Sequence, residues 1–339
     1  MKKRVFTICC ITTFLASLSL AGCSSGSDEP SGGNNNTGGS GNTSHIVPSD
    51  PDSGNNNNSK PDNIKPGTSG TGDNTNPGEN TGSGGSSESG DNAGSSDNSP
   101  KWKLVFEDNF GTAGDTVASA PDSEYWSLAQ KGTDTWNRYM SESYDQAFQK
   151  GGYLYLYGEQ VDGQYQTGGI ESRNKFDFEY GQMKCRARFL RQPQGNHTGI
   201  WMMPETQDLG KWPRSGEIDV MEHLDDQGVY YSTVHYFDNN SQKDASSDKD
   251  INVDNNDFNI YGVVWTKDAV SFTLNGNVVF TYKNDDPSAG ISYQYPFQYP
   301  FYLILSQSLG GRGTWEGVID NSELPAIFQI DWIKVWQGE

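Results

Sequence analysis

The chain has 339 residues, and its 44 acidic and 24 basic side chains give it a formal net charge of −20. An acidic surface of this kind argues against nucleic acid and against anionic ligands as partners, and it suits a neutral ligand. The composition changes sharply along the chain and divides it into residues 1–22, 23–100 and 101–339.

Residues 1–22 have the pattern of an export signal. Basic residues at positions 2–4 precede an apolar run from Val5 to Leu20, which is too short to span a membrane. The run ends in Leu-Ala-Gly-Cys, which resembles a bacterial lipobox in which Cys23 is lipidated. The acidic segment that follows resembles the export signal of surface lipoproteins. We therefore expect an outer-membrane lipoprotein, tethered through Cys23, on the cell surface of a Gram-negative bacterium. An ordinary signal peptide cleaved elsewhere is the alternative.

Residues 23–100 consist almost entirely of Gly, Ser, Asn, Thr, Asp and Pro. A segment with so little apolar surface to bury cannot offset the entropy lost on ordering, so we expect a disordered linker. It would separate the lipid from the folded part.

The cysteines exclude an intrachain disulfide in the folded part. Cys9 and Cys10 leave with the signal and Cys23 takes the lipid, so Cys185 alone remains, and we expect its thiol to be buried. Three tryptophans are also expected in the core: Trp265, Trp332 and Trp336.

Residues 101–339 predict an all-β sandwich, because short alternating runs are bounded by Gly, Asn and Asp. Met183–Phe189 alternates apolar and basic residues, as a half-buried antiparallel strand does. Ala269–Tyr282 predicts a hairpin that turns at Asn275-Gly276. Phe301–Leu305 is apolar on both faces and predicts a central strand.

The segment Ser215–Glu222 places three carboxylates among apolar residues. Strand alternation puts Glu217 and Asp219 on one face, and Glu222 joins them only if a β-bulge absorbs one residue. Like charges this close raise one another's pKa, so one acid tends to keep a proton. A retaining glycosidase needs such a pair, with its carboxyl groups about 5–5.5 Å apart. A solvated strand face is the alternative.

Three segments carry a family resemblance: Gly199–Pro204, Trp212-Pro213 and Gly216–Glu222. Together they resemble glycoside hydrolase family 16, the laminarinase and β-glucanase family, and the resemblance runs from Trp102 to Trp336. It implies a β-jelly roll of the concanavalin A-like type, with two curved sheets and a concave substrate groove. It also implies that the last strand pairs near the first.

The resemblance assigns roles to the three acids. Glu217 is the nucleophile, and Glu222 is the general acid that later acts as base. Asp219 orients Glu217. We expect the negative charges of Asp219 and Glu217 to raise the pKa of Glu222, so that it keeps its proton.

Five further residues are substrate-binding candidates. Trp212 lies in the motif and is expected to form a flat platform for a sugar ring. Trp201 faces either the groove or the interior, and His235 binds substrate or has a structural role. Arg138 and Gln307 are additional candidates with the same two alternatives.

No catalytic cofactor is expected, because the chain has no H-E-x-x-H motif and no Cys/His cluster. Members of the family often hold a structural calcium where the first and last strands meet. Glu107, Gly152 and Asp331 are compatible with such a site, and a plain surface is the alternative. The segment from Asp238 to Asp257 lacks EF-hand spacing, so we interpret it as a loop at the groove rim that shapes substrate choice.

The leading hypothesis is a monomeric retaining endo-β-glycosidase that hydrolyses internal bonds of a β-1,3-glucan or a mixed-linkage β-1,3-1,4-glucan. An endo-β-galactosidase that acts on host mucin-type O-glycans or other galactans is the alternative, because Thr167–Arg173 departs from the usual laminarinase sequence. A non-catalytic carbohydrate-binding lipoprotein and a transglycosylase also stay open.

Overall fold

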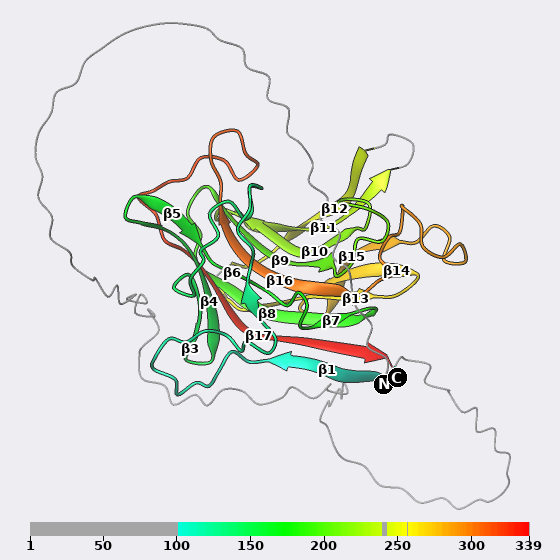
Figure 1. Cartoon of the computed structure of the whole chain (residues 1–339), viewed down its shortest axis with the longest axis horizontal. Coiled ribbons are helices and arrows are strands. Elements are labelled where there is room, and N and C mark those ends of the chain that lie inside the picture. Colours follow the sequence, from blue (N-terminus) through cyan, green and yellow to red (C-terminus); the bar gives the residue numbers. More distant parts are fainter. Residues whose placement is uncertain (1–100, 239–242, 256, 339) are drawn as a thin grey trace, which may run out of the picture. The chain divides into compact units, whose positions relative to one another are not determined.

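The computed structural model describes residues 101–238, 243–255 and 257–338 (Figure 1). The signal, the linker and Cys23 lie outside these residues, so their predictions are untested. Every regular element in the described residues is a strand. This part of the chain accordingly contains no helix that could cross a membrane.

The structure contains strands along the whole described part of the chain. They are β1 (Trp102–Asp108), β2 (Ser127–Leu128), β3 (Ala147–Lys150), β4 (Tyr153–Val161), β5 (Gln164–Thr167), β6 (Gly169–Glu171), β7 (Asp177–Phe178), β8 (Gly181–Arg191), β9 (Asn196–Pro204), β10 (Glu217–Leu224), β11 (Val229–Asp238), β12 (Lys243–Asn252), β13 (Asn259–Trp265), β14 (Ala269–Leu274), β15 (Asn277–Lys283), β16 (Phe301–Leu309) and β17 (Ala326–Gly338).

The strands form two antiparallel sheets. Sheet I has the order β15-β14-β13-β8-β17-β4-β3, with β1 beside β17 and β5 beside β4. Sheet II has the order β12-β11-β10-β9-β16-β6-β2, with β7 beside β16. Figure 1 shows strands from distant parts of the sequence side by side in each sheet. The expected all-β sandwich is confirmed.

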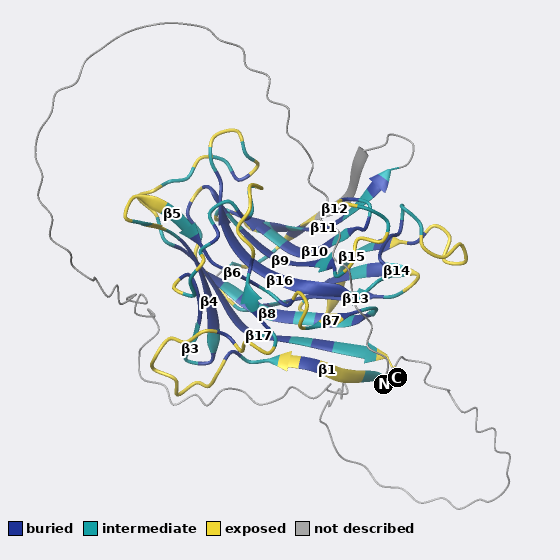
Figure 2. Ribbon diagram, viewed as in Figure 1, coloured by how far each residue is buried: buried dark blue, intermediate teal, exposed yellow. Residues whose placement is uncertain are grey.

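The core lies between the sheets and follows from alternation along the strands (Figure 2). In β8, Met183, Cys185, Ala187 and Phe189 are buried, whereas the basic residues between them are half-buried. Each large apolar side chain buried in this way stabilises the fold by about 1.5–3 kcal/mol. Cys185 is a free, fully buried thiol, as expected.

Strand β16 is central and buried on both faces. Phe301, Leu303 and Leu305 pack in the core between the sheets. Tyr302 and Ile304 belong to a separate apolar cluster with a tryptophan of β9, and this cluster lies on the other face of sheet II. We call this face, turned away from sheet I, the site face.

Two predictions about strand pairing are confirmed. The β14–β15 hairpin turns at Asn275 (φ 50°) and Gly276 (φ 85°), so both turn residues are left-handed, as a tight hairpin turn requires. Strand β1 pairs antiparallel with β17, from Trp102 opposite Gly338 onward. The two ends of the described part therefore lie together in sheet I.

The prediction for the core tryptophans is right for Trp265, which is fully buried, and wrong for Trp332 and Trp336. Alternation along β17 turns Ile333 and Val335 into the core, so both tryptophans lie half-buried on the outer face of sheet I.

The interpretation of residues Asp238 to Asp257 as a rim loop is also wrong for most of this segment. Residues Lys243–Asn252 form strand β12, which pairs with β11 at ten successive positions and extends sheet II. Its polar composition carries no apolar alternation, so only the neighbouring strand identifies it.

The residues of the predicted calcium site do not fit a bound cation. Glu107 Oε1 lies 2.7 Å from Lys334 Nζ, and Asp331 Oδ2 lies 2.5 Å from Arg186 Nη1. The hydrogen bond from Lys334 is the main reason that the pKa of Glu107 lies below its ordinary value. Each carboxylate thus already has a cationic partner that would repel calcium.

Candidate functional site

The three motif carboxylates lie on the site face of β10, on both sides of a β-bulge. Glu217 pairs with His235 of β11, and the register then shifts between Asp219 and Glu222. The same shift occurs against β9. Ile218, Val220 and Met221 all belong to the core, so the bulge absorbs one apolar residue and returns Glu222 to the site face. The predicted bulge is confirmed.

The residue before the motif must be glycine. Gly216 has φ +83°, and a Cβ there would lie 2.8 Å from the ring of Phe297. This residue therefore sets where β10 begins and how Glu217 leaves the turn.

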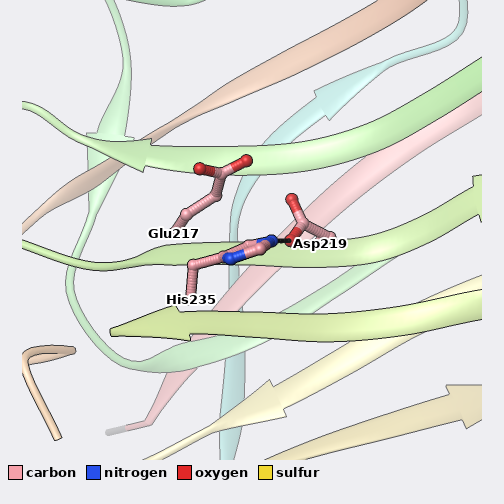
Figure 3. A group of neighbouring side chains, drawn as sticks. All are labelled: Glu217, Asp219 and His235. Atoms are coloured by element: carbon pink, nitrogen blue, oxygen red, sulfur yellow. Dashed lines mark ion pairs between the residues drawn. The ribbon is translucent and has the colours of Figure 1, made fainter. Parts of the chain in front are cut away.

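One end of the site, around the predicted nucleophile Glu217, consists of Glu217, Asp219, His235 and Trp212. Trp212 Nε1 donates a 2.5 Å hydrogen bond to Glu217 Oε2, and Asp219 also hydrogen-bonds to Glu217. His235 Nε2 lies 3.7 Å from Asp219 Oδ2. Figure 3 shows the side chains of Glu217, Asp219 and His235 converging, with the His235–Asp219 ion pair dashed. The structure thus places the predicted Trp212 and His235 beside the predicted nucleophile.

The same group has the geometry of a metal site. The ligand atoms of Glu217, Asp219 and His235 lie within 4.8 Å of one another, and no other such group occurs among the described residues. A metal ion held there would occupy the carboxylate oxygens of Glu217. It would therefore block a nucleophile rather than assist it.

The other end of the site lies around Glu222, the predicted general acid. His197 Nε2 of β9 lies 3.4 Å from Glu222 Oε1, and Thr233 Oγ1 of β11 donates a 3.1 Å hydrogen bond to Glu222 Oε2. His197 also contacts Trp315 and Glu316 of the 310–317 loop, with ring centroids 5.3 Å apart for Trp315.

The electrostatics of the two glutamates differ because their partners differ. Burial raises the pKa of Glu217; His235 opposes this effect, and the charge of Glu222 adds to it. Burial also raises the pKa of Glu222, but the hydrogen bond and charge of His197, with smaller effects from His235 and Thr233, bring that pKa below its ordinary value. The expected raised pKa of Glu222 is therefore wrong for this structure. Because the two acids interact, they titrate as a pair, and their different partners push the two pKa values apart.

The remaining candidates differ in their access to the site. Trp201 lies on the site face opposite Asp219, but it is only 8% exposed because Trp136 covers it. Arg138 donates a hydrogen bond from Nη2 to the carbonyl of Gly310, so it anchors the loop that carries Trp315.

Gln307 does not reach the site. It is 1% exposed, points toward Gly158 of sheet I, and hydrogen-bonds with Thr198 and the carbonyls of residues 197 and 308. Its prediction as a substrate-binding residue is wrong. In a strand buried on both faces, the sequence pattern does not show which face a polar residue takes.

Four residues at the Glu222 end were missed by the sequence analysis: His197, Thr233, Trp315 and Glu316. Alternation along β9 from Trp201 would have placed His197 on the site face, since the two residues are four apart. The 310–317 loop offers no such periodicity, so only the fold brings its residues to the site.

Comparisons with known proteins place the chain in a family of enzymes. The model for glycosyl hydrolases family 16 matches residues 132–334. A keratan-sulfate endo-1,4-β-galactosidase from Sphingobacterium multivorum is 37% identical over 245 residues, which are 70% of this chain and 55% of that enzyme. The chain thus spans about half the length of that relative. A β-glucanase from Rhodothermus marinus is 30% identical over 254 residues, which are 70% of this chain and 86% of that enzyme.

A solved structure from work on endo-acting O-glycanases, which prominent members of the human gut microbiota express to initiate mucin breakdown, is also similar. It aligns with a TM-score of 0.62 and 30% identity, over 70% of this chain and 100% of that chain. The fold, the bulged strand with its three carboxylates and these matches agree: the chain belongs to glycoside hydrolase family 16.

Proposed function

We propose that the protein is a retaining endo-β-galactosidase that cleaves internal bonds in mucin-type host glycans. The observation that carries the catalytic part is the placement of Glu217 and Glu222 on one face of β10, on both sides of the bulge and with separate partners. The substrate class is supported by the 37% identical galactosidase and by the similar structure from work on mucin breakdown.

The first chemical step uses both glutamates. The ionised carboxylate of Glu217 attacks the anomeric carbon, and the carboxyl of Glu222 gives its proton to the departing glycosidic oxygen. The C–O bond to the leaving sugar breaks as the bond to Glu217 forms. The hydrogen bond from Trp212 orients the attacking carboxylate.

The second step restores both acids. Glu222, now ionised, takes a proton from a water molecule, whose oxygen attacks the anomeric carbon and displaces Glu217. Two inversions at the same carbon give a product with retained configuration. Transfer to a sugar hydroxyl instead of water would give transglycosylation by the same intermediate.

The reactive form needs a proton on Glu222, whose pKa the free protein holds below its ordinary value. A bound glycan excludes water from both half-buried glutamates and so disfavours the charged form of each. The leaving oxygen is then the acceptor for the Glu222 proton.

Two exposed tryptophans mark the ends of the site. Trp212 is 47% exposed beside Glu217, and Trp315 is 55% exposed beside His197 and Glu222. Flat aromatic faces suit sugar rings. Because Glu222 protonates the leaving oxygen, we assign Trp315 to the leaving-group side.

Charge narrows the choice among galactosides. A chain with a net charge of −20 repels heavily sulfated or sialylated stretches, so neutral stretches of host glycans are the better substrates. A β-1,3- or mixed-linkage β-glucan remains the second candidate, favoured by the 30% identical β-glucanase, of which the chain covers 86%.

We also propose that the protein is exported and anchored in the outer membrane by a lipid on Cys23. The basic start, the short apolar run and the Leu-Ala-Gly-Cys sequence support this. Metabolic labelling with palmitate should mark the wild type and not Cys23→Ala. Equal labelling of both proteins would contradict the anchor.

Product analysis tests the activity. Purified protein is incubated separately with released mucin O-glycans, keratan sulfate, laminarin and lichenan, with Glu217→Gln as the inactive control. Oligosaccharides from the mucin glycans, absent with the control and initially of β configuration by NMR, are expected. Products from laminarin or lichenan alone would establish the glucanase instead. Binding without products from any of the four would favour a carbohydrate-binding protein.

A further inference from the structure

We propose that His197 is a positioning residue for Glu222, and that Ser308 and Glu316 hold its ring in place. The proposal rests on the acid/base role of Glu222 described above. It assigns a function to three residues outside the motif, on β9, on β16 and on the 310–317 loop.

The carboxyl of Glu222 is held from both neighbouring strands. His197 Nε2 lies 3.4 Å from its Oε1, and Thr233 Oγ1 donates to its Oε2 at 3.1 Å. Each oxygen therefore has its own partner, which restricts rotation of the carboxyl about its last torsion. The same histidine lowers the pKa of Glu222, against the opposing effect of burial.

The other nitrogen of the ring is held by two groups. His197 Nδ1 lies 3.2 Å from Ser308 Oγ and 3.9 Å from Glu316 Oε1. Ser308 Oγ donates its single proton to the carbonyl oxygen of His197. The hydroxyl then accepts from Nδ1–H, which leaves Nε2 facing Glu222.

This arrangement suits a carboxyl that changes its protonation state in every catalytic cycle. One proton between the two groups serves either form: Nε2 accepts from a protonated Glu222, or a ring protonated on both nitrogens donates to an ionised Glu222. After that proton has passed to the leaving oxygen, Thr233 Oγ1 still donates to the carboxylate. His197 and Thr233 together therefore hold the carboxyl in one place through the cycle.

The burial of Glu316 supports the same conclusion. Its side chain is 4% exposed and that of His197 is 11% exposed. A buried carboxylate is costly unless it is paired, and His197 supplies the partner. Trp315, next to Glu316 in the loop, packs against both His197 and Tyr231. The 310–317 loop thus carries both Trp315, the proposed leaving-group platform, and Glu316, which lies against the His197 ring that holds Glu222.

The chain offers a matched set of histidines. His197 contacts Glu222, whereas His235 contacts Asp219 at the nucleophile end. His223, the neighbour of Glu222 in β10, is fully buried against Phe189 on the core side and touches neither catalytic glutamate. His223→Gln is therefore the control for a purely structural loss.

The test compares two aryl β-glycosides of one disaccharide that the wild type accepts. A 2,4-dinitrophenyl group leaves without protonation, whereas a 4-methoxyphenyl group needs the acid. We expect His197→Ala to lower kcat on the 4-methoxyphenyl substrate about tenfold or more beyond its effect on the other, as loss of general acid catalysis does, with little change in KM. Glu316→Gln should act in the same direction. His197→Gln, whose amide reaches the position of Nε2, should recover most of the rate.

If His197→Ala and Glu316→Gln lower kcat equally on the two substrates, the proposal is overturned. His223→Gln serves as the reference for a loss of kcat that comes from structure alone. If His197→Ala fails to fold, the comparison of Glu316→Gln with the wild type decides in the same way. Glu222→Ala separates a failure of the acid/base assignment of Glu222 from a failure of the positioning role of His197. If it shows no dependence on the leaving group, the acid/base assignment itself fails; if it does and the His197 and Glu316 variants do not, only the positioning role fails.

Discussion

Replacing Trp212 with Phe removes one hydrogen bond from the proposed nucleophile and keeps an aromatic face at the surface. In the wild type, Trp212 Nε1 donates to Glu217 Oε2 at 2.5 Å, which stabilises the ionised carboxylate. This hydrogen bond lowers the pKa of Glu217, against the larger effect of burial, which raises it. Phe has no donor, so the substitution should raise the pKa of Glu217.

The size of the effect follows from exposure. A hydrogen bond to a charged group contributes about 1.5–3 kcal/mol when water cannot replace the donor. Trp212 is 47% exposed, so water can partly replace its N–H as the donor to Glu217. We therefore expect the hydrogen bond to contribute about 1 kcal/mol. Losing this interaction raises the pKa of Glu217, and 1 kcal/mol corresponds to about a fivefold change in the equilibrium between its two forms.

The assay is the pH dependence of kcat/KM. Glu217 must be ionised to attack, so the acidic limb of the profile should move to higher pH in Trp212→Phe, with rates on that limb about fivefold lower. Rates well above that limb should change less than rates below it. Trp315→Phe is the matched control. Trp315 is similarly exposed, at 55%, but it packs against His197 at the Glu222 end of the site. An unmoved acidic limb, or an equal shift in both variants, would refute the reasoning.

Four further outcomes are expected. Asp219→Asn should retain more activity than Glu217→Gln at equal Tm, because Asp219 acts on the nucleophile without attacking; equal losses would contradict this. Burial lowers the pKa of His223 from 6.5 to about 4, so stability should be full above pH 6.5 and fall toward pH 4 by up to about 3 kcal/mol, less so in His223→Gln, by urea titration. Gly216→Ala should lower both Tm and kcat, since its Cβ meets the ring of Phe297; an unchanged Tm would be inconsistent. EDTA followed by excess calcium should leave Tm unchanged; a rise with calcium would restore the predicted metal site.

The sequence predicted those features that depend on neighbouring residues. The period of two in Met183–Phe189 and the turn at Asn275-Gly276 are local properties of the backbone, and both are found. The same reasoning placed Glu217, Asp219 and Glu222 on one face through a bulge. The apolar residues between them must all point into the core, and only a bulge allows this while the three acids share the other face.

Apart from the pairing of β1 with β17, which the family resemblance implied, features that depend on distant partners were not predicted. Strand β12 has no apolar pattern and forms by pairing with β11. The carboxylates of the expected calcium site pair with Lys334 and Arg186, and Gln307 turns inward from a strand that is buried on both faces. Each of these outcomes was decided by a neighbour from another strand.

The chemistry of the site divides in the same way. The sequence alone determined which carboxylates form the pair, because they lie within six residues of one strand. Only the tertiary structure decided their protonation, because the pKa of Glu222 depends on burial and on His197 from β9, and His197 depends on Glu316 from a loop far along the chain. A pKa is set by burial and by charges a few ångströms away, and strand alternation carries no information about those.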